Sequence, residues 1–485
     1  ARAHRHPAMT HAGRRPGDRR IRVQRMQPEQ FTVKPPKRLR KPPSPAVSLI
    51  TLFVVLISVG TLLLMLPVAA NDAAPTRFVD ALFTATSAAC VTGLVVLDTA
   101  THWSPFGQAV ILLLIQAGGF GIMAGSTLLL TLFMGRRTTL RDRVVVQESL
   151  GGLELGSVMT LVKRIAIFTV VCEVIGAVVL SISFMAGPEA GPRWHPLGIW
   201  WGIFHSVSAF NNAGFDVIGG YRSLTPFVDD WTVLLVIGML LILGGLGYAI
   251  VGDAIAKRRW ARMALETKLV LGMTAVLLLA GTALIASTEW GNPATLGALP
   301  EEQRLLNAVF ESATLRTAGF TALDTGALRE ATLFVVMALM FIGGASGSTA
   351  GGIKVNTFSV LLIAIVSTVK GQPSAMAFGR RIPHSTVYRA LAVALLSIAF
   401  VFTIGIGLTL TTEATFVQTL FEAVSAFGTV GASTGITPEL SDPARLITTF
   451  AMFAGRLGPL TLVLALAARV RPIPYRPAVE PVRIG

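Results

Sequence analysis

The sequence predicts an all-α polytopic membrane protein in which four similar segments follow one another along a single chain. Two observations lead to this prediction. Hydrophobic residues make up 52% of the chain and charged residues only 14%, a balance unlike that of a soluble domain. A short motif that ends in glycine also occurs four times, and such a repeat usually reflects a repeated structural element.

Long blocks of the chain are almost free of charge and are expected to cross a membrane. Most of them exceed the ~18–20 residues that a helix needs to span a hydrocarbon core about 30 Å thick. We therefore expect eight transmembrane helices, within residues 47–69, 105–134, 165–186, 231–252, 268–287, 331–342 with 355–369, 386–412 and 446–468.

Each copy of the motif begins at a phenylalanine and ends at a glycine. The copies are FTATSAACVTG at Gly93, FHSVSAFNNAG at Gly214, FESATLRTAG at Gly319 and FEAVSAFGTVG at Gly431. The third copy is one residue shorter than the others. Successive glycines are separated by 121, 105 and 112 residues, so the repeat nearly fills the chain.

Basic residues gather at every second connection between the predicted spans, which places those connections in the cytoplasm. They are Arg136, Arg137, Arg141, Arg143, Lys257, Arg258, Arg259, Arg262, Lys370, Arg380 and Arg381. The C-terminal Arg469, Arg471 and Arg476 agree with this assignment. The charges predict a multi-pass protein of the cell inner (plasma) membrane with both termini in the cytoplasm.

Most of the net charge of +15 lies at the N-terminus, where residues 1–41 hold 13 Lys and Arg against Asp18 and Glu29. A basic segment rich in Pro and His, with few apolar residues, is expected to be disordered. Its expected partner is the anionic lipid of the cytoplasmic leaflet, at about 1 kcal/mol per basic residue. We do not expect a nucleic acid as partner.

The segments that carry the motif are too short to cross the membrane. They are residues 79–90, 197–210, 304–315 and 416–427. The charges of the flanking connections do not change side, so each segment is expected to enter and leave on the outer side as a re-entrant helix. The irregular return must line a water-filled path or pack against protein. We therefore expect four pseudo-symmetric M1–loop–M2 repeats, with eight transmembrane and four re-entrant pore helices around one central pore.

A glycine at the end of each re-entrant helix lets successive backbone carbonyls point toward one axis, because glycine adopts the necessary φ without steric cost. A ring of carbonyls can replace the hydration shell of a cation. The alternative is that these glycines are ordinary helix C-caps, but four copies at matched distances favour an ion path. The candidate filter residues are Val91, Thr92, Gly93, Asn212, Ala213, Gly214, Thr317, Ala318, Gly319, Thr429, Val430 and Gly431.

The repeated M1–P–M2 plan with the strings CVTGL, NNAGF, RTAGF and FGTVG resembles the Trk/Ktr/HKT superfamily of cation transporters. The resemblance covers about residues 47–470 and is closest to the KtrB-type pore subunit. It implies potassium uptake, with K⁺ as the transported ion bound at the filter, and Gly93 favours K⁺ over Na⁺. It leaves Na⁺ open as an activator.

The same resemblance implies partners that the chain does not contain. These are a second copy of the pore subunit, giving a homodimer, and a cytosolic, nucleotide-binding KtrA/TrkA-like regulatory ring. We expect this chain itself to bind no nucleotide and no metal other than potassium at the filter.

The sixth predicted span is interrupted by GGASGSTAGG, residues 343–352. Five glycines cannot continue a stable helix, at nearly 1 kcal/mol each relative to alanine, so this backbone is expected to face a cavity as a gate. Close helix packing through small residues is the alternative. In the resembled family this segment is the intramembrane loop that closes the pore. The candidate gate residues are Gly343, Gly344, Gly347, Ser348, Thr349, Gly351, Gly352, Lys354 and Arg456.

Arg456 lies in the middle of the last span, where an arginine costs about 2.5–3.5 kcal/mol on insertion scales. It either pairs with a buried acid such as Glu311 or Glu422 or, as the resemblance implies, lies below the filter beside the gate loop. In the second case our hypothesis is that Arg456 restricts the cavity electrostatically and donates to the carbonyls of residues 343–352. The two glutamates themselves either attract cations at the outer mouth or satisfy a helix start.

The chain carries no zinc motif, nucleophile elbow or pair of catalytic acids, so we expect no enzyme and no catalytic residue. The alternative function is a sodium-permeable or cation-coupled secondary transporter with broken helices. The predicted boundaries are an N-terminal tail at 1–46, repeats at 47–135, 136–256, 257–371 and 372–470, and a C-terminal tail at 471–485.

Overall fold

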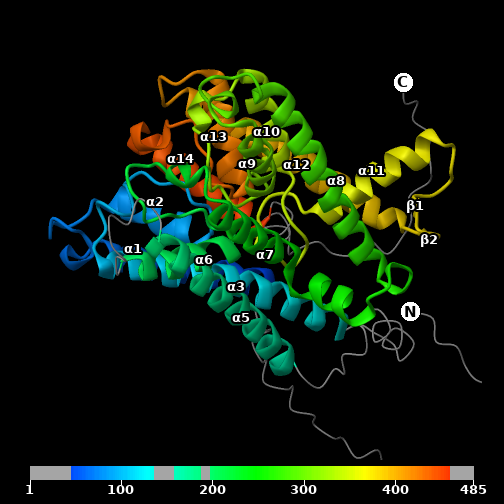
Figure 1. The fold of residues 1–485 in the computed structure, drawn as a ribbon. Helices are drawn as coiled ribbons and strands as arrows, with labels where there is room; N and C mark the ends of the chain where they lie inside the picture. The colour runs from blue at the N-terminus through cyan, green and yellow to red at the C-terminus, as the bar shows by residue number, and fades with distance from the viewer. Residues whose placement is uncertain (1–44, 136–157, 187–196, 459–485) are drawn as a thin grey trace, which may run out of the picture. The chain divides into compact units, whose positions relative to one another are not determined.

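The computed structural model describes residues 45–135, 158–186 and 197–458 (Figure 1). Most of this part is helical, and its only strands form a short hairpin, β1 (Met376–Ala377) with β2 (Arg380–Arg381). The predicted N-terminal tail up to residue 44, the basic connection at 136–157 and the C-terminal tail lie outside the described residues.

The helices follow one another as long, short and long elements, and we refer to each such set as a triplet. The first is α1 (Pro45–Leu64), α2 (Phe78–Ala89) and α3 (Pro105–Gly135), and the second is α5 (Val158–Ala186), α6 (Leu197–Phe210) and α7 (Trp231–Lys257). The third is α8 (Leu265–Glu289), α9 (Glu301–Thr314) and the pair α10 (Glu330–Phe341) and α11 (Val355–Val369). The fourth is α12 (His384–Thr409), α13 (Phe416–Gly428) and α14 (Asp442–Leu457).

Short 3₁₀ turns lie in the connections between these helices. They are Pro67–Ala69, Thr225–Phe227, Trp260–Arg262, Leu296–Ala298, Thr325–Ala327 and Thr437–Glu439.

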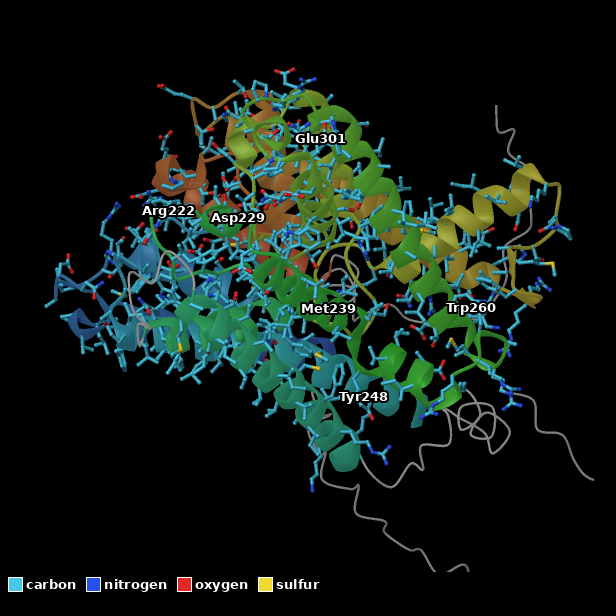
Figure 2. All side chains as sticks on the ribbon, in the orientation of Figure 1. Arg222, Asp229, Met239, Tyr248, Trp260 and Glu301 are labelled. Carbon is cyan, nitrogen blue, oxygen red and sulfur yellow. The ribbon has the colours of Figure 1, made fainter. Side chains whose placement is uncertain are left out.

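Four described helices are long and apolar enough to cross a membrane, namely Leu161–Ala186 in α5, and α7, α8 and α12. Only 28% of the apolar window is buried in α5, α8 and α12, which open their triplets, whereas 50% is buried in α7, which closes one. The opening helices therefore present most of their apolar surface outward. Along α7 the labelled residues run from Asp229, just before the helix, through Met239 to Tyr248, and Trp260 lies beyond its end (Figure 2).

The short helices form the centre of the described fold. The leading phenylalanine of every motif is buried, with Phe83, Phe204 and Phe421 at 0% exposure and Phe310 at 3%. Each short helix packs against the opening helix of its own triplet and against a helix of the preceding triplet: α3 with α6, α7 with α9, and α10 with α13. The short helices α2, α6 and α13 also pack against the closing helix of their own triplet. The series closes because α14 packs against α2.

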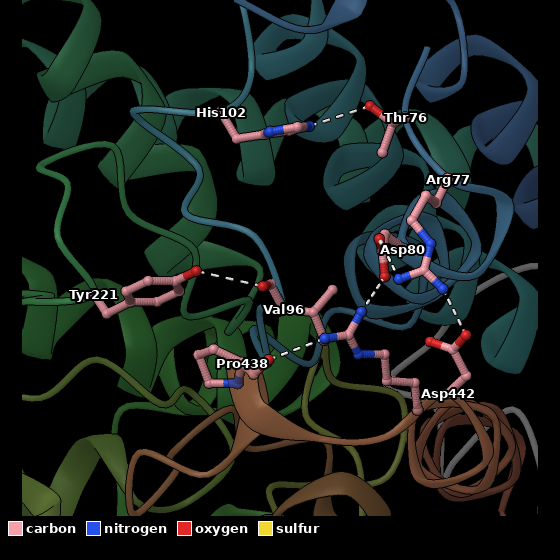
Figure 3. Close-up of polar contacts among 9 residues, drawn as sticks. Thr76, Arg77, Asp80, Val96, His102, Tyr221, Pro438 and Asp442 are labelled. Carbon is pink, nitrogen blue, oxygen red and sulfur yellow. Dashed lines mark hydrogen bonds and ion pairs between the residues drawn. The ribbon is translucent and has the colours of Figure 1, made fainter. Parts of the chain in front are cut away.

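The contact between α14 and α2 joins the last triplet to the first, where no chain connection runs. Arg445 of α14 forms an ion pair with Asp80 of α2, and Arg77 Nη2 lies 2.5 Å from Asp442 Oδ2 (Figure 3). Arg445 also donates to the carbonyl of Pro438 at 2.9 Å. The side chains of Arg445 and Asp80 are 13% and 7% exposed, whereas Arg77 and Asp442 are 63% and 47% exposed. The buried pair therefore dominates this closure.

The helix α7 is kinked at Gly247, whose φ of 74° and ψ of 160° are not helical. Only glycine adopts this backbone region readily. A Cβ at this position would lie 3.1 Å from the Gly347 oxygen and 3.2 Å from Ser348 Cα. The kink thus gives room to residues 343–352, which lie between α10 and α11 outside any helix.

We predict that Arg445→Ala destabilises the protein by about 3 kcal/mol, because it leaves the buried Asp80 carboxylate with only the more distant Arg77, whose Nη1 lies 3.9 Å from Asp80 Oδ2. Arg77→Ala is the matched control and should cost about 0–1 kcal/mol, since its ion pair with Asp442 is exposed and its contact with Asp80 is 3.9 Å long. Thermal unfolding of the purified protein in detergent compares the two variants. Equal losses of stability would contradict the assigned roles.

We further predict that Gly247→Ala loosens the loop at 343–352, because alanine at this φ and ψ is strained by about 1–3 kcal/mol. The control is Gly252→Ala in the same helix, where a Cβ meets nothing within 4 Å and alanine is the better helix former. Hydrogen–deuterium exchange of the loop should rise only in the first variant. Unchanged exchange would show that the kink does not support the loop.

Candidate functional site

The four motif glycines lie in one closed ring. A Cβ on each glycine would come closer than 3.0 Å to the carbonyl oxygen that precedes the glycine of another copy. The four contacts join Gly93 to Ala213, Gly214 to Ala318, Gly319 to Val430 and Gly431 to Thr92. The last contact returns to the first copy, so the ring is complete and has no room for a side chain at any of its glycines.

The backbone of the ring has positive φ at every second residue. The glycines have φ of 90°, 69°, 70° and 94° in chain order. The residue two positions earlier is also left-handed in every copy: Val91 (56°), Asn212 (58°), Thr317 (79°) and Thr429 (49°). A left-handed residue that is not glycine costs of order 1–3 kcal/mol and persists where function requires it. This alternation turns successive carbonyls to one side, unlike an extended strand.

The N–H groups of the ring point back toward the short helices. The residue before each glycine donates its N–H to a carbonyl near the end of the preceding short helix, at Ser87, Ser208, Thr314 and Ser425, over 2.8–2.9 Å. Ser87 Oγ and Ser425 Oγ also accept the N–H groups of Gly93 and Gly431 at 3.1 and 3.2 Å. The helix ends thus hold the donors outside the ring.

The carbonyl groups of the ring remain without partners. Within the described part of the chain, no carbonyl oxygen of the candidate filter residues accepts a hydrogen bond from the backbone. All of them except Gly431 are buried. Buried carbonyls are normally paired, so a whole ring of free ones indicates that another ligand uses them. The four helix C-termini beside the ring favour a positively charged ligand.

The loop at 343–352 packs against the first ring residue of three of the four motif copies. Thr349 Oγ1 donates to Asn212 Oδ1 at 2.7 Å. A Cβ on Gly343 would lie 3.2 Å from Thr317 Cγ2, and one on Gly351 would overlap Thr429 Oγ1. The loop therefore touches the left-handed residue of the second, third and fourth copies.

Helix α7 and the neck of the loop hold it in place. Ala345 N donates to Gly245 O at 2.8 Å and Thr349 N to Gly244 O at 3.3 Å. At the neck, Gly343 N donates to Ile353 O at 2.8 Å. The sequence analysis missed Gly244, Gly245 and Gly247 of α7, although the string GGLG inside a hydrophobic run marks them.

Two cationic side chains donate to neighbouring carbonyls of the loop. Arg456 Nη1 donates to Thr349 O and its Nη2 to Gly118 O of α3 at 3.3 Å, and Lys354 Nζ donates to Ala350 O. Arg456 is only 4% exposed and forms no ion pair within the described residues. Of the two alternatives for Arg456, the structure has the contact with the loop. The remaining candidate gate residues, Gly344, Gly347, Ser348 and Gly352, lie in the same loop.

Glu311 and Glu422 of the motif lie neither at the outer mouth nor at a helix start, the two places expected from the sequence. Glu311 and Glu422 lie well inside α9 and α13 and are 4% and 0% exposed, so they neither start a helix nor line an open mouth. Glu311 Oε1 accepts the N–H groups of Ala322 and Leu323 at 2.8 and 3.1 Å. Glu422 accepts from Thr437. Each carboxylate fixes the segment that follows its own ring glycine.

The segments that leave the ring carry two further acids, which the sequence analysis did not single out. Asp216 follows Gly214 by two residues, and burial, together with the nearby Asp98, raises the pKa of its carboxyl to about 6. Asp98 Oδ2 accepts the N–H of Tyr221 at 2.9 Å, and the Tyr221 hydroxyl donates to Val96 O at 3.3 Å (Figure 3). These contacts join the segment that follows Gly93 to the segment that follows Gly214.

The chain is similar to known cation transport proteins. The sequence matches the TrkH family, described as "Cation transport protein", over residues 30–471. It is 42% identical to Ktr system potassium uptake protein B of Bacillus subtilis, over 86% of this chain and 91% of that protein. It is 40% identical to the potassium/sodium uptake protein NtpJ of Enterococcus hirae, over 89% and 95%.

The fold also matches a solved structure. The potassium transporter TrkH from Vibrio parahaemolyticus superposes with a TM-score of 0.68 at 19% identity, over 89% of this chain and 86% of that one. The family consists of cation transporters and is not a class of enzymes. The chain is therefore a multi-pass membrane protein of the TrkH family of cation transport proteins, of the KtrB type within the Trk/Ktr superfamily.

Proposed function

We propose that this chain is the pore subunit of a potassium uptake system and that the ring of free backbone carbonyls selects the ion. The ring of unpaired, buried oxygens carries this proposal. Oxygens at fixed positions replace the hydration shell of a monovalent cation. The names of the relatives support potassium as that cation, and the glycine at position 93 fits a preference for K⁺ over Na⁺.

The proposed architecture has eight transmembrane helices and four re-entrant pore helices around one pore, in the plasma membrane, with both termini in the cytoplasm. The proposed assembly is a homodimer regulated by a cytosolic nucleotide-binding ring, with Na⁺ as an activator and anionic lipid at the N-terminal tail. The homodimer and the ring are implied by the resemblance to KtrB-type pore subunits, and the name of NtpJ, potassium/sodium uptake protein, supports a role for sodium.

In the proposed gating mechanism, the loop at 343–352 blocks the path next to the ring. Its contacts with three of the four copies and its bonds to Arg456 and Lys354 support this role. Opening requires the carbonyls of Thr349 and Ala350 to leave these cations. Arg456 also adds positive charge to the cation path while the loop is closed.

A sodium-permeable or cation-coupled transporter is the second candidate, because the break between α10 and α11 and the kink in α7 are also features of secondary transporters. Flux into proteoliposomes under an imposed potassium gradient separates the two. Potential-driven K⁺ flux without a proton gradient supports the pore. Strict dependence on a co-transported ion would replace it with the transporter.

We predict that Gly431→Ala lowers the preference for K⁺ over Na⁺ at least about tenfold, which corresponds to ~1.4 kcal/mol. The added methyl group would displace the Thr92 carbonyl. Gly435→Ala is a matched control, because its φ of 95° equals that of Gly431 at 94° within a degree but a Cβ meets nothing within 4 Å. Ion competition for flux measures both. An equal preference in the two variants would rule out the ring as the filter.

We predict that Arg456→Ala raises basal K⁺ flux of the chain alone about tenfold or more, because a hydrogen bond from a charged group is worth about 1.5–3 kcal/mol. The control is Arg304→Ala, since Arg304 also donates to backbone carbonyls, those of Leu299 and Gly297, in the connection before α9. Liposome flux without any regulatory partner is the measurement. Unchanged or reduced flux in Arg456→Ala would overturn the latch.

A further inference from the structure

A carboxylate lies among the helices at a place that the proposed mechanism does not use. Glu173 is in the middle of α5 and is 7% exposed. Its Oε1 accepts from Asn211 Nδ2 at 3.0 Å and its Oε2 from Gln116 Nε2 at 3.2 Å. Asn211 Nδ2 also donates to Gln116 Oε1 at 2.9 Å. We refer to Glu173, Gln116 and Asn211 as the amide–carboxylate triad.

The triad is costly for a membrane protein. A carboxylate within a span is expensive, faces the protein interior and generally marks a functional site. Within the described part of the chain Glu173 has no ion pair with lysine or arginine, and two neutral amides are its side-chain partners. Stability alone does not explain such a group, because an apolar residue would pack here at lower cost.

The triad adjoins the second copy of the ring. Asn211 directly precedes Asn212, the left-handed residue of the second copy. The Asn212 side chain accepts a hydrogen bond from Thr349 of the loop and donates one to Leu241 O at 3.3 Å. The other copies have Cys90, Arg316 and Gly428 at the position of Asn211. An amide side chain at this position therefore occurs only in the second of the four motif copies.

The triad also reaches the gate through one turn of α3. A Cβ on Gly119 would overlap Asn211 Oδ1, so this oxygen packs directly on the helix. The preceding residue, Gly118, accepts from Arg456 Nη2 at 3.3 Å. Asn211, which adjoins the second copy of the ring, and Arg456, which contacts the loop, therefore both contact residues 116–119 of α3.

We propose that Glu173 is a positioning residue for ion selection: through Gln116 and Asn211 it fixes the second copy of the ring. This inference rests on the proposed role of the ring as the filter. The Glu173 carboxyl group accepts from both amides at once, so it holds Gln116 and Asn211 in one arrangement. Without the Glu173 carboxyl group, Asn211 loses a hydrogen-bond acceptor next to the second copy of the ring. The carbonyls of that copy then move away from the positions that select the ion.

The geometry of the triad allows a sharp test. In Glu173→Gln, the new side-chain NH₂ group lies opposite the NH₂ group of either Gln116 or Asn211. One hydrogen bond is therefore lost, although the side chain at position 173 keeps its size. The double variant Glu173→Gln with Gln116→Glu exchanges carboxylate and amide across the same contact and restores every donor to an acceptor. The selectivity of the full chain in proteoliposomes, measured by competition between K⁺ and Na⁺, is the readout.

We expect Glu173→Gln to lower the preference for K⁺ about tenfold and the double exchange to return it to within about twofold of wild type. Gln116→Met keeps the carboxylate, removes both hydrogen bonds of Gln116 and should lower the preference in the same direction, which preserves the test if Glu173→Gln does not fold. The control is Glu289→Gln, because Glu289 is also buried and accepts from Asn292, Thr295 and Thr332 but touches no ring residue. It should change thermal stability without changing ion preference.

The outcomes separate this inference from the proposed function. Wild-type selectivity that falls in Gly431→Ala but persists in Glu173→Gln overturns the role of the triad and leaves the filter intact. Failure of the double exchange to restore selectivity in a folded protein also overturns it. A wild-type chain without potassium selectivity would instead overturn the proposed function.

Discussion

The structure depends on one constraint, namely that backbone polar groups inside a membrane need partners. The described helices meet it internally, except at the ring, where the N–H groups turn outward to the short helices and the carbonyls accept no hydrogen bond from the described residues. Everything near the ring serves this arrangement. The left-handed residues aim the carbonyls, the glycines allow the copies to touch, and Glu311 and Glu422 fix the segments that leave it.

Much of the fold could be predicted because its causes are local in the sequence. Hydrophobic blocks, basic connections and repeated glycines indicate the long helices, the short helices between them and the break after Phe341. The positive φ of Gly93 follows from the same reasoning. That of Thr429 does not, because a β-branched residue disfavours this conformation and nothing local reveals the compensation.

The features that the sequence analysis missed depend on contacts between distant residues. Glu311 lies 11 and 12 residues from its partners, and Glu173 lies 57 and 38 residues from Gln116 and Asn211. The kink at Gly247 is hidden inside an apolar run that reads as one continuous helix, and its cause is a loop from the next triplet. Arg456 could be singled out because its charge is conspicuous in an apolar span, but its two carbonyl partners could not be derived from sequence alone.

The seam between α14 and α2 also has a consequence for biosynthesis. The chain emerges from the N-terminus, so Asp80 is made long before Arg445, and the first ring glycine long before the fourth. Until the last triplet enters the bilayer, the early copies have no neighbour on one flank, and the buried Asp80 has only the exposed Arg77, 3.9 Å away, as counter-charge. The ring therefore closes only after translation of the final triplet, and a chain truncated before it keeps one flank of the first short helix uncovered.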